Sequence, residues 1–338
     1  MGSVSVYGIG NPLIDVLADV SDAELDELAL HKGTMHLVDD EAADRILARI
    51  SEREKTYASG GACPNTMNTL AALGASVALS GCIGTDELGA LYSRGLADDG
   101  VQSDLRVEDG PTGSSIVLVS PDGERTMCTR LGVCRRYSPE AVNHEMVRAA
   151  SYLYFTGYMW DTEAQKAAVT AAIETAHRSE TAVVFDVADP MAVERSRDAF
   201  LKLIETEVTV VLANRDEARM LLDNQGLSAA DAAGQLSRRT RIAVVKDGAR
   251  GSCVAVDGHA VSVSAQRVTA VDTTGAGDSY AAGFIFGLLS ESSPADAARL
   301  ASQIAAQIVR QRGAQFAGEA RRTLNSTASR YLPQAVTP

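Results

Sequence analysis

The segment Asp272-Thr273-Thr274-Gly275-Ala276-Gly277-Asp278 combines two carboxylates, two glycines and small side chains ahead of a stretch rich in small apolar residues. We expect a strand at residues 268–271 before it and a helix over residues 278–289 after it. The backbone N–H groups of Gly275-Ala276-Gly277 would then point into one place, where a helix N-terminus favours an anion. The segment therefore predicts an anion hole for phosphate, with the Asp278 carboxylate placed as a general base for a hydroxyl nucleophile.

A helix cap is the alternative interpretation of the same residues, because Asp is common at helix N-termini and Gly-rich segments often only form turns. Two other phosphate-binding motifs are excluded. No G-K-[ST] follows the segment, so it is not a Walker A loop. Gly8-Ile9-Gly10 is not a dinucleotide fingerprint either, since Leu13 occupies the position of the third glycine.

Strand-like and helix-like segments alternate from residue 150 onward. The strands are expected at 152–155, 182–186, 208–213 and 242–246, with helices at 163–178, 195–205 and 215–223 between them. Earlier segments add strands at 3–9 and 77–82 and helices at 21–30, 65–73 and 86–99, and later ones add a hairpin-like pair at 252–256 and 260–263 and a helix at 294–312. This alternation predicts an α/β fold with a parallel sheet covered on both faces.

One hairpin interrupts the alternation. Residues 116–120 and 125–129 are strand-like and are joined by Pro121-Asp122-Gly123-Glu124, whose residue types suit a tight turn. We found no repeat of fixed period, no low-complexity segment and no linker that would separate two independent domains.

Composition excludes several classes of protein. The 338 residues carry 31 Lys and Arg against 44 Asp and Glu, a net charge of −13, and no basic cluster, which argues against a nucleic-acid partner. No run of eighteen apolar residues is present, so membrane insertion is not expected. The five cysteines, at 63, 82, 128, 134 and 253, are odd in number and widely spaced, which is typical of reduced thiols in a cytoplasmic protein.

Several segments together resemble the ribokinase-like (phosphofructokinase B-type) family of carbohydrate and nucleoside kinases, over about residues 4–320. The segments are Gly60-Gly61-Ala62-Cys63-Pro64-Asn65-Thr66, residues 81–89 and the 272–278 motif. The opening Gly8-Ile9-Gly10-Asn11-Pro12-Leu13-Ile14-Asp15 resembles the adenosine kinase branch in particular. The resemblance implies one domain over 1–330: a doubly wound, mainly parallel sheet with helices on both faces, and a discontinuous small β-sheet lid from about 13–40 and 110–137.

The resemblance also implies a reaction, the ATP-dependent transfer of a phosphoryl group to the primary hydroxyl of a ribose-like ring, with Mg²⁺. Asp278 falls on the family's base, and Gly275, Ala276 and Gly277 fall on its anion hole. Asn214 and Glu217 match an N-x-x-E motif that orders Mg²⁺ and its waters around the phosphates; an ordinary helix cap is the alternative. Gly248 and Gly251 would line the ATP site, and Lys246 is either a phosphate ligand or a solvated strand end.

The acceptor site implied by the resemblance lies between sheet and lid. Asp15 and Asn65 would hold ribose hydroxyls, beside Asn11 and the backbone at Gly60 and Gly61. Without the resemblance, Asp15 is a turn residue and Asn65 is a helix cap. The residues expected to enclose a base are Leu13, Met35, Leu131 and Tyr158, although such side chains are more often core.

Arg125 falls where adenosine kinases have an arginine that reaches toward the transferred phosphate; an exposed hairpin charge is the alternative. The family's monovalent-cation site, for K⁺, is implied at Asp272 and Thr274 with carbonyl groups near residues 312–314. One departure from the family pattern is Ala62-Cys63-Pro64 where many relatives have small residues, and Cys63 is expected either to touch the substrate pocket or to pack.

The resemblance favours adenosine as the acceptor. Two alternatives stay in the same class, another nucleoside such as inosine or cytidine and a sugar of the ribose or fructose type. A non-catalytic binding protein that keeps the fold is the alternative from another class, and the presence of Asp278 argues against it. Partners are therefore expected to be a small nucleoside or sugar and ATP, bound by a monomer or a homodimer.

Overall fold

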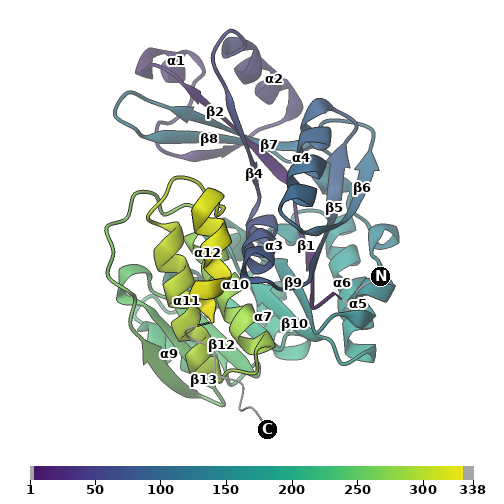
Figure 1. The fold of residues 1–338 in the computed structure, drawn as a ribbon, viewed down its shortest axis with the longest axis vertical. Helices are drawn as coiled ribbons and strands as arrows, with labels where there is room; N and C mark the ends of the chain where they lie inside the picture. The colour runs from purple at the N-terminus through teal and green to yellow at the C-terminus, as the bar shows by residue number, and fades with distance from the viewer. Residues whose placement is uncertain (1–3, 330–338) are drawn as a thin grey trace.

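A computed structural model describes residues 4–329. Ser3, at the start of the first expected strand, and residue 330, at the expected domain end, lie outside the described residues. The described chain forms two sheets, a large one in the lower part of Figure 1 and a small one above it.

The large sheet has nine strands in the order β14-β13-β12-β11-β10-β9-β1-β5-β6. Their bounds are β1 Val6–Ile9, β5 Val77–Gly84, β6 Gln102–Glu108, β9 Tyr152–Thr156, β10 Ala182–Asp186, β11 Val210–Asn214, β12 Ile242–Lys246, β13 Ser252–Val256 and β14 His259–Val263. All neighbours pair in parallel except β13, which is antiparallel to both β12 and β14. The mainly parallel sheet expected from the sequence is confirmed.

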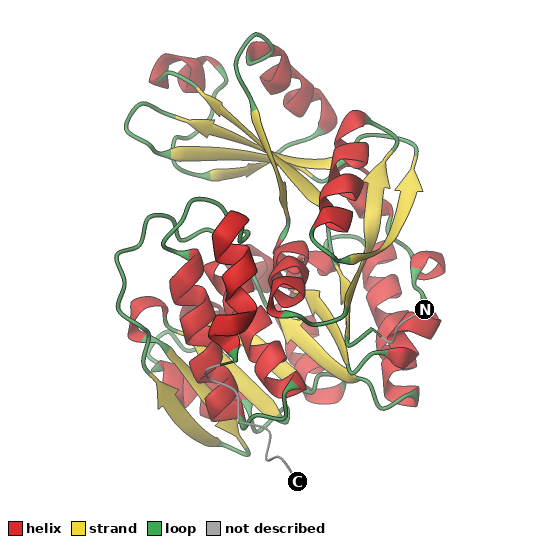
Figure 2. Cartoon of the chain, viewed as in Figure 1, coloured by secondary structure: helices red, strands yellow, loops and turns green. Residues whose placement is uncertain are grey.

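Helices cover both faces of the large sheet (Figure 2). On one face lie α5 His144–Ala149, α6 Glu163–Arg178, α7 Pro190–Thr206, α8 Arg215–Leu221 and α9 Ala229–Leu236; on the other lie α3 Ala62–Leu73, α4 Glu87–Asp98, α10 Ala276–Leu289 and α11 Pro294–Ile308. Successive strand residues serve opposite cores: in β10, Val184 packs on the α10 side and Phe185 on the α6 side. Such two-sided burial explains the uninterrupted apolar runs. A last helix, α12 Gly318–Ala328, packs against α3 and α11.

The small sheet has five strands in the order β3-β8-β7-β2-β4. These are β2 Leu13–Asp19, β3 Met35–Leu37, β4 Thr56–Gly60, β7 Gly113–Val119 and β8 Arg125–Arg130. Helices α1 Asp22–Glu27 and α2 Asp40–Arg49 cover one face, with Leu25, Ile46 and Ile116 in the shared core. The β7–β8 hairpin matches the expected one. The first segment of the small sheet continues to Gly60, past the expected limit at about residue 40, because β4 pairs with β2.

Several expected elements differ in the structure. Residues 268–271 form no strand: they are an exposed loop that is tied by Val271 N–H to the Val309 carbonyl at the end of α11, so no neighbouring strand pairs with them. Helix α7 begins at Pro190 rather than 195, because Asp189 caps it. Helix α11 ends at Ile308 rather than 312. Strands β3, β4 and β6 and helices α2, α5, α9 and α12 were not expected.

Candidate active site

The candidate residues gather at the carboxyl edge of the large sheet, where β10, β11 and β12 end in Asp186, Asn214 and Lys246. In open parallel sheets this edge is where ligands bind, since helix N-termini and strand ends meet there. Helix α10 begins at the same edge and contributes Asp278 as its third residue.

Asp278 accepts a hydrogen bond of 2.9 Å from Asn65 Nδ2, which comes from the first turn of α3. Burial raises the pKa of Asp278 to about 7; the Asp186 carboxylate acts in the same direction, while the Asn65 hydrogen bond and the Lys246 ammonium oppose it. A carboxyl group that titrates near neutral pH is suited to taking a proton from a hydroxyl group.

The expected anion hole forms the N-terminus of α10, whose N-cap is Gly275 with φ of +74°. Glycine is needed there for a second reason, because a Cβ would lie 2.7 Å from Ala314 Cα. The amides of Gly275 and Gly277 donate to no backbone carbonyl within residues 4–329. The amide of Ala276 differs from the expectation: it donates to the Thr273 carbonyl at 3.2 Å and closes a turn. Of the three amides expected to form the anion hole, those of Gly275 and Gly277 are therefore free of backbone partners in residues 4–329.

Lys246 is not a solvated strand end. Its Nζ lies 2.9 and 3.1 Å from the two carboxylate oxygens of Asp186, and both side chains are largely buried. Burial disfavours the ammonium form, but the carboxylates of Asp186 and Glu217 outweigh it, and the pKa of Lys246 is raised. A Cβ at Gly277 would lie 3.5 Å from Lys246 Nζ, so the charge lies next to the anion hole.

Asn214 and Glu217 form a capping box at the start of α8. Asn214 Nδ2 donates to Glu217 Oε1 at 2.6 Å, and the Asn214 backbone N–H donates to Oε2 at 2.7 Å. Burial raises the pKa of Glu217 to about 7, with Lys246 opposing. The helix cap considered from the sequence is therefore present, and it holds a buried carboxylate at the same sheet edge as Asp186.

These carboxylates fit a magnesium ion that is bound mainly through water and phosphate, the usual protein mode for this cation. Within the described ranges no three His, Cys, Asp or Glu residues lie together as a metal cluster. A cage made by protein ligands alone is therefore not present in residues 4–329, and any Mg²⁺ here would rely on Glu217, Asp186 and the phosphates.

Gly248 and Gly251 bound a 3₁₀ turn between β12 and β13, at φ of +55° and +104°. A Cβ at Gly251 would collide with the Val263 carbonyl oxygen, so this position requires glycine for close packing as well as for its backbone angle. The turn follows Lys246 directly and lies at the same sheet edge.

The expected acceptor residues lie where the small sheet meets α3. Burial raises the pKa of Asp15, on β2, to about 6, with Arg125 opposing. A Cβ at Gly60 would lie 2.9 Å from Asp15 Oδ1, so the glycine leaves room for the carboxylate. Gly61 is the N-cap of α3 at φ of +99°, close to the Asn11 carbonyl, and Asn11 Oδ1 accepts from Gln165 Nε2 at 2.9 Å.

The four residues expected to enclose a base come from four different segments of the chain. Leu13 and Met35 lie on β2 and β3, which are three strand positions apart, roughly 14 Å at the usual strand spacing. The pairing also sets Met35 in line with Leu17 rather than with Leu13. Leu131 immediately precedes the 3₁₀ helix Gly132–Arg136. Tyr158 follows β9, donates to Asp189 Oδ2 at 3.2 Å, and has its pKa raised by burial.

Arg125, expected near the transferred phosphate, and Asp272, expected at the cation site, form an ion pair with each other. Arg125 Nη1 lies 3.0 Å from Asp272 Oδ2, and the same carboxylate accepts from Thr274 N–H, Thr274 Oγ1 and Gly313 N–H at 3.0, 2.7 and 2.9 Å. Burial acts against the ionised form, but these hydrogen bonds and Arg125 outweigh it and lower the pKa of Asp272 to about 2.

Several residues that contact the candidate site residues were not predicted from the sequence. Asp186 ends an apolar strand, and a polar residue at that position is a signal for the ligand edge of a parallel sheet. Asp189, Gln165 and Gln315 have no local motif, and their partners lie far away in the chain.

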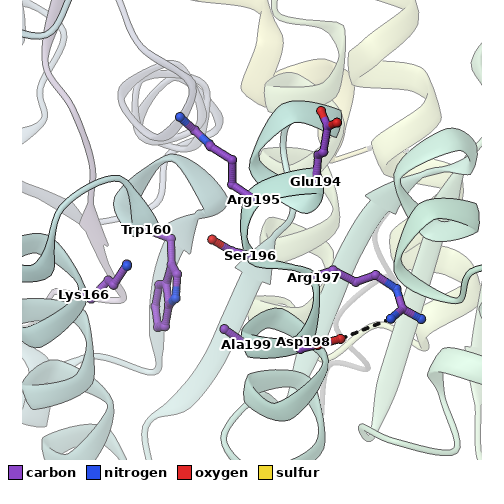
Figure 3. A pocket seen from close by; sticks show the side chains of 8 residues that line it. All are labelled: Trp160, Lys166, Glu194, Arg195, Ser196, Arg197, Asp198 and Ala199. Carbon is purple, nitrogen blue, oxygen red and sulfur yellow. Dashed lines mark hydrogen bonds and ion pairs between the residues drawn. The ribbon is translucent and has the colours of Figure 1, made fainter.

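Two open hollows lie away from Asp278. One, of about 420 Å³, lies between α6 and α7 at the backbone kink of Ser196, and Figure 3 shows Trp160 and Lys166 on one side and residues 194–199 on the other. The other, of about 570 Å³, lies beside Asp86 and Arg130 where α2 of the small sheet approaches the main body. Neither is lined by the residues expected from the sequence.

The chain matches the model of the pfkB family of carbohydrate kinases over residues 36–321. It belongs to the pfkB family. An adenosine kinase of Schizosaccharomyces pombe is 25% identical over 309 residues, 85% of this chain and 89% of that protein. The adenosine kinase structure from Sinorhizobium meliloti is 33% identical with a TM-score of 0.87, covering 97% of this chain and 99% of that one. A probable sugar kinase structure from Rhizobium etli CFN 42 is 30% identical, also with a TM-score of 0.87, covering 98% and 99%.

Membership of the pfkB family makes this chain an ATP-dependent kinase with a hydroxyl acceptor, a nucleoside or sugar kinase. The family implies ATP and usually Mg²⁺, which agrees with the carboxylates at the sheet edge. In residues 4–329, none of the helices has the length and apolar character needed to span a bilayer.

Proposed function

We propose that this kinase transfers the γ-phosphoryl group of ATP to the 5′-hydroxyl of adenosine and forms AMP. The observation that carries the phosphotransfer is Asp278, a carboxyl group with a pKa of about 7 beside the free amides of Gly275 and Gly277. The names of the relatives from S. pombe and S. meliloti support adenosine as the acceptor.

In the proposed mechanism, Asp278 takes the proton of the acceptor hydroxyl group while the hydroxyl oxygen attacks the γ-phosphorus of ATP. The bond from that phosphorus to the oxygen bridging to ADP breaks, ADP leaves, and Asp278 later releases its proton to water. The amides of Gly275 and Gly277 stabilise the charge on the transferred group. Asp15 accepts hydrogen bonds from ribose hydroxyl groups, and Asn65 helps to hold the ribose ring beside the Asp278 carboxylate. Positioning and fixed charges supply most of the acceleration.

Magnesium, held through water by Glu217 and Asp186 beside Asn214, would neutralise charge on the phosphates. Gly248 and Gly251 supply backbone to the nucleotide site, and Lys246 supports the phosphates through its charge next to Gly277. For potassium we propose Asp272 and Thr274 with the carbonyl groups near Gly313. We further propose a cytoplasmic enzyme of purine salvage, monomeric or homodimeric.

A sugar kinase is the second candidate, and a specific observation favours it. The R. etli relative, with a TM-score of 0.87 over 98% of this chain, is described as a probable sugar kinase. Both candidates use the same Asp278 and the same anion hole.

ADP release with adenosine, inosine, cytidine, ribose and fructose separates the two candidates. We expect the highest kcat/KM with adenosine, and a response to a free sugar alone would reject the nucleoside proposal. Asp278→Asn is expected to bind acceptor and ATP but to lose roughly 10²-fold or more in turnover. Turnover near the wild-type value in that variant would reject Asp278 as the base.

A further inference from the structure

A continuous chain of side-chain hydrogen bonds runs from Asp278 to helix α12. Asn65 Nδ2 donates to Asp278 Oδ2 at 2.9 Å, and Gln315 Nε2 donates to Asn65 Oδ1 at 3.0 Å. Asn68 Nδ2 donates to Gln315 Oε1 at 3.3 Å, and Arg321 Nη1 donates to Asn68 Oδ1 at 2.6 Å. The chain thus crosses from α10 to α3, to the segment after α11, back to α3 and on to α12, which lie side by side in Figure 1.

The donor-to-acceptor direction of this series of hydrogen bonds is fixed at its outer end, by Arg321. A guanidinium only donates hydrogen bonds and a carboxylate only accepts them, whereas an amide can present either of its ends. Arg321 donates to Asn68 Oδ1, and Asn68 Nδ2 also donates to the Asp99 carboxylate. The Asn68 amide therefore has one favourable orientation, with its NH₂ group toward Asp99 and Gln315.

Each inner amide follows from the one before it. Because Asn68 offers an NH₂ group, Gln315 turns its oxygen outward and its NH₂ group inward, toward Asn65. Asn65 then accepts from Gln315 and presents its own NH₂ group to Asp278. Asn65 and Asn68 are 5% and 3% exposed, so water is poorly placed to replace these bonds, and a reversed amide would leave unsatisfied groups.

We propose that Gln315, Asn68 and Arg321 are positioning residues, which hold the Asn65 amide so that its NH₂ group rather than its carbonyl oxygen faces Asp278. The inference rests on the proposed role of Asp278 as the base. It assigns a function to residues of α3, of α12 and of the segment before α12 that touch no reacting atom.

A reversed Asn65 would set a carbonyl oxygen against the Asp278 carboxylate. Two acceptors repel unless the carboxyl group keeps its proton, so the base would stay protonated at neutral pH. The other titratable groups that face Asp278 are Asp186 on β10, Lys246 on β12, Cys63 on α3, and Tyr154 and Tyr158 on and after β9. None of these groups is altered by substitutions at 315 and 321. Gln315→Met also leaves the net charge unchanged, so its shift reports on the amide chain, whereas Gln315→Glu adds a negative charge and Arg321→Met removes a positive one, so the shift in Arg321→Met is compared with that in Arg322→Met.

The test uses three variants of the full chain and one control. Gln315→Met removes both bonds of that amide at similar size, and Gln315→Glu offers only acceptors and so favours the reversed Asn65. Arg321→Met frees the outer end without touching Asn65 or Gln315. Arg322→Met, the exposed neighbour on α12, is the matched control.

Carboxyl ¹³C NMR of aspartate-labelled protein, with the Asp278 signal assigned by Asp278→Asn, follows the titration without relying on activity. We expect the Asp278 midpoint to rise in the order wild type, Arg321→Met, Gln315→Met, Gln315→Glu, and to stay unchanged in Arg322→Met. The acid limb of kcat/KM is expected to shift in parallel, with roughly threefold or greater loss near pH 6.5 and recovery near pH 9.

Unchanged midpoints in folded Gln315→Met and Arg321→Met would overturn the proposal, as would an equal loss of kcat/KM at every pH. If Gln315→Met fails to fold by thermal melting, Arg321→Met alone decides the result. Failure of the proposed function looks different: Asp278→Asn would then keep its turnover, whatever the NMR midpoints show.

Discussion

Arg125 Nη1, on strand β8 of the small sheet, lies 3.0 Å from Asp272 Oδ2, in the loop that leads into helix α10. The same Asp272 oxygen accepts the Gly313 N–H. The ion pair therefore joins the small sheet to the loop that precedes the free amides. Arg125 keeps about a third of its side chain exposed, so the pair contributes little to stability, on the order of 1 kcal/mol or less.

Arg125→Met is expected to lower kcat/KM by roughly 10- to 10²-fold, because a positive charge is lost beside the loop that leads to the proposed phosphate site. Steady-state kinetics and thermal melting measure the two effects separately. Arg45→Met is the control, since Arg45 on α2 has an exposed partner, Glu41, away from the site. Equal kinetics in Arg125→Met and Arg45→Met would contradict a role for Arg125 in the reaction.

The pH dependence of the wild-type enzyme follows from Asp278. Its pKa is about 7 because the carboxyl group is buried, and the base works only when it is deprotonated. We expect kcat/KM to fall about tenfold for each pH unit below that value and to be level just above it. A pH series of initial rates measures the limb. A profile that stays flat down to pH 5 would be inconsistent with this base.

The free energy of unfolding is also expected to depend on Asp278, but it falls as the pH rises, whereas kcat/KM increases. Folding raises the pKa of Asp278 above its unfolded value, so its contribution to stability is full at low pH and is lost as the pH rises through about 7. Asp278→Asn removes a buried charge and should raise the melting temperature by a few degrees near pH 8 but not near pH 5. Asp26→Asn, at an exposed position on α1, is the control. An increase of equal size at both pH values would point to another cause.

The sequence predicted the elements whose signals are local. The apolar runs that became β9 to β12 are buried on both faces, and the 272–278 segment marks the start of α10 by its own glycines. Strand β4, Thr56–Gly60, is mostly polar and becomes a strand only because β2 offers it an edge. Residues 268–271 have the composition of a strand but no partner, so they form a loop.

The parts of the site that escaped prediction depend on which elements become neighbours. Asp186 and Lys246 are 60 residues apart and meet only because β10, β11 and β12 are adjacent in the sheet. Gln315 reaches Asn65 across 250 residues. Met35 and Leu13, both expected around a base, lie on strands β3 and β2 with two other strands between them. No local motif contains such information.

The Asp186–Lys246 pair gives a last prediction. Lys246→Met leaves the Asp186 carboxylate buried and unpaired, and breaking a buried pair from one side typically costs about 3–5 kcal/mol. Urea unfolding should show this loss, and Asp186→Leu in the same chain should recover a large part of it, because the uncompensated charge is then gone. Lys166→Met, which breaks the exposed pair with Glu163, is expected to cost about 1 kcal/mol or less. Similar losses in Lys246→Met and Lys166→Met would mean that the buried pair is solvated in solution.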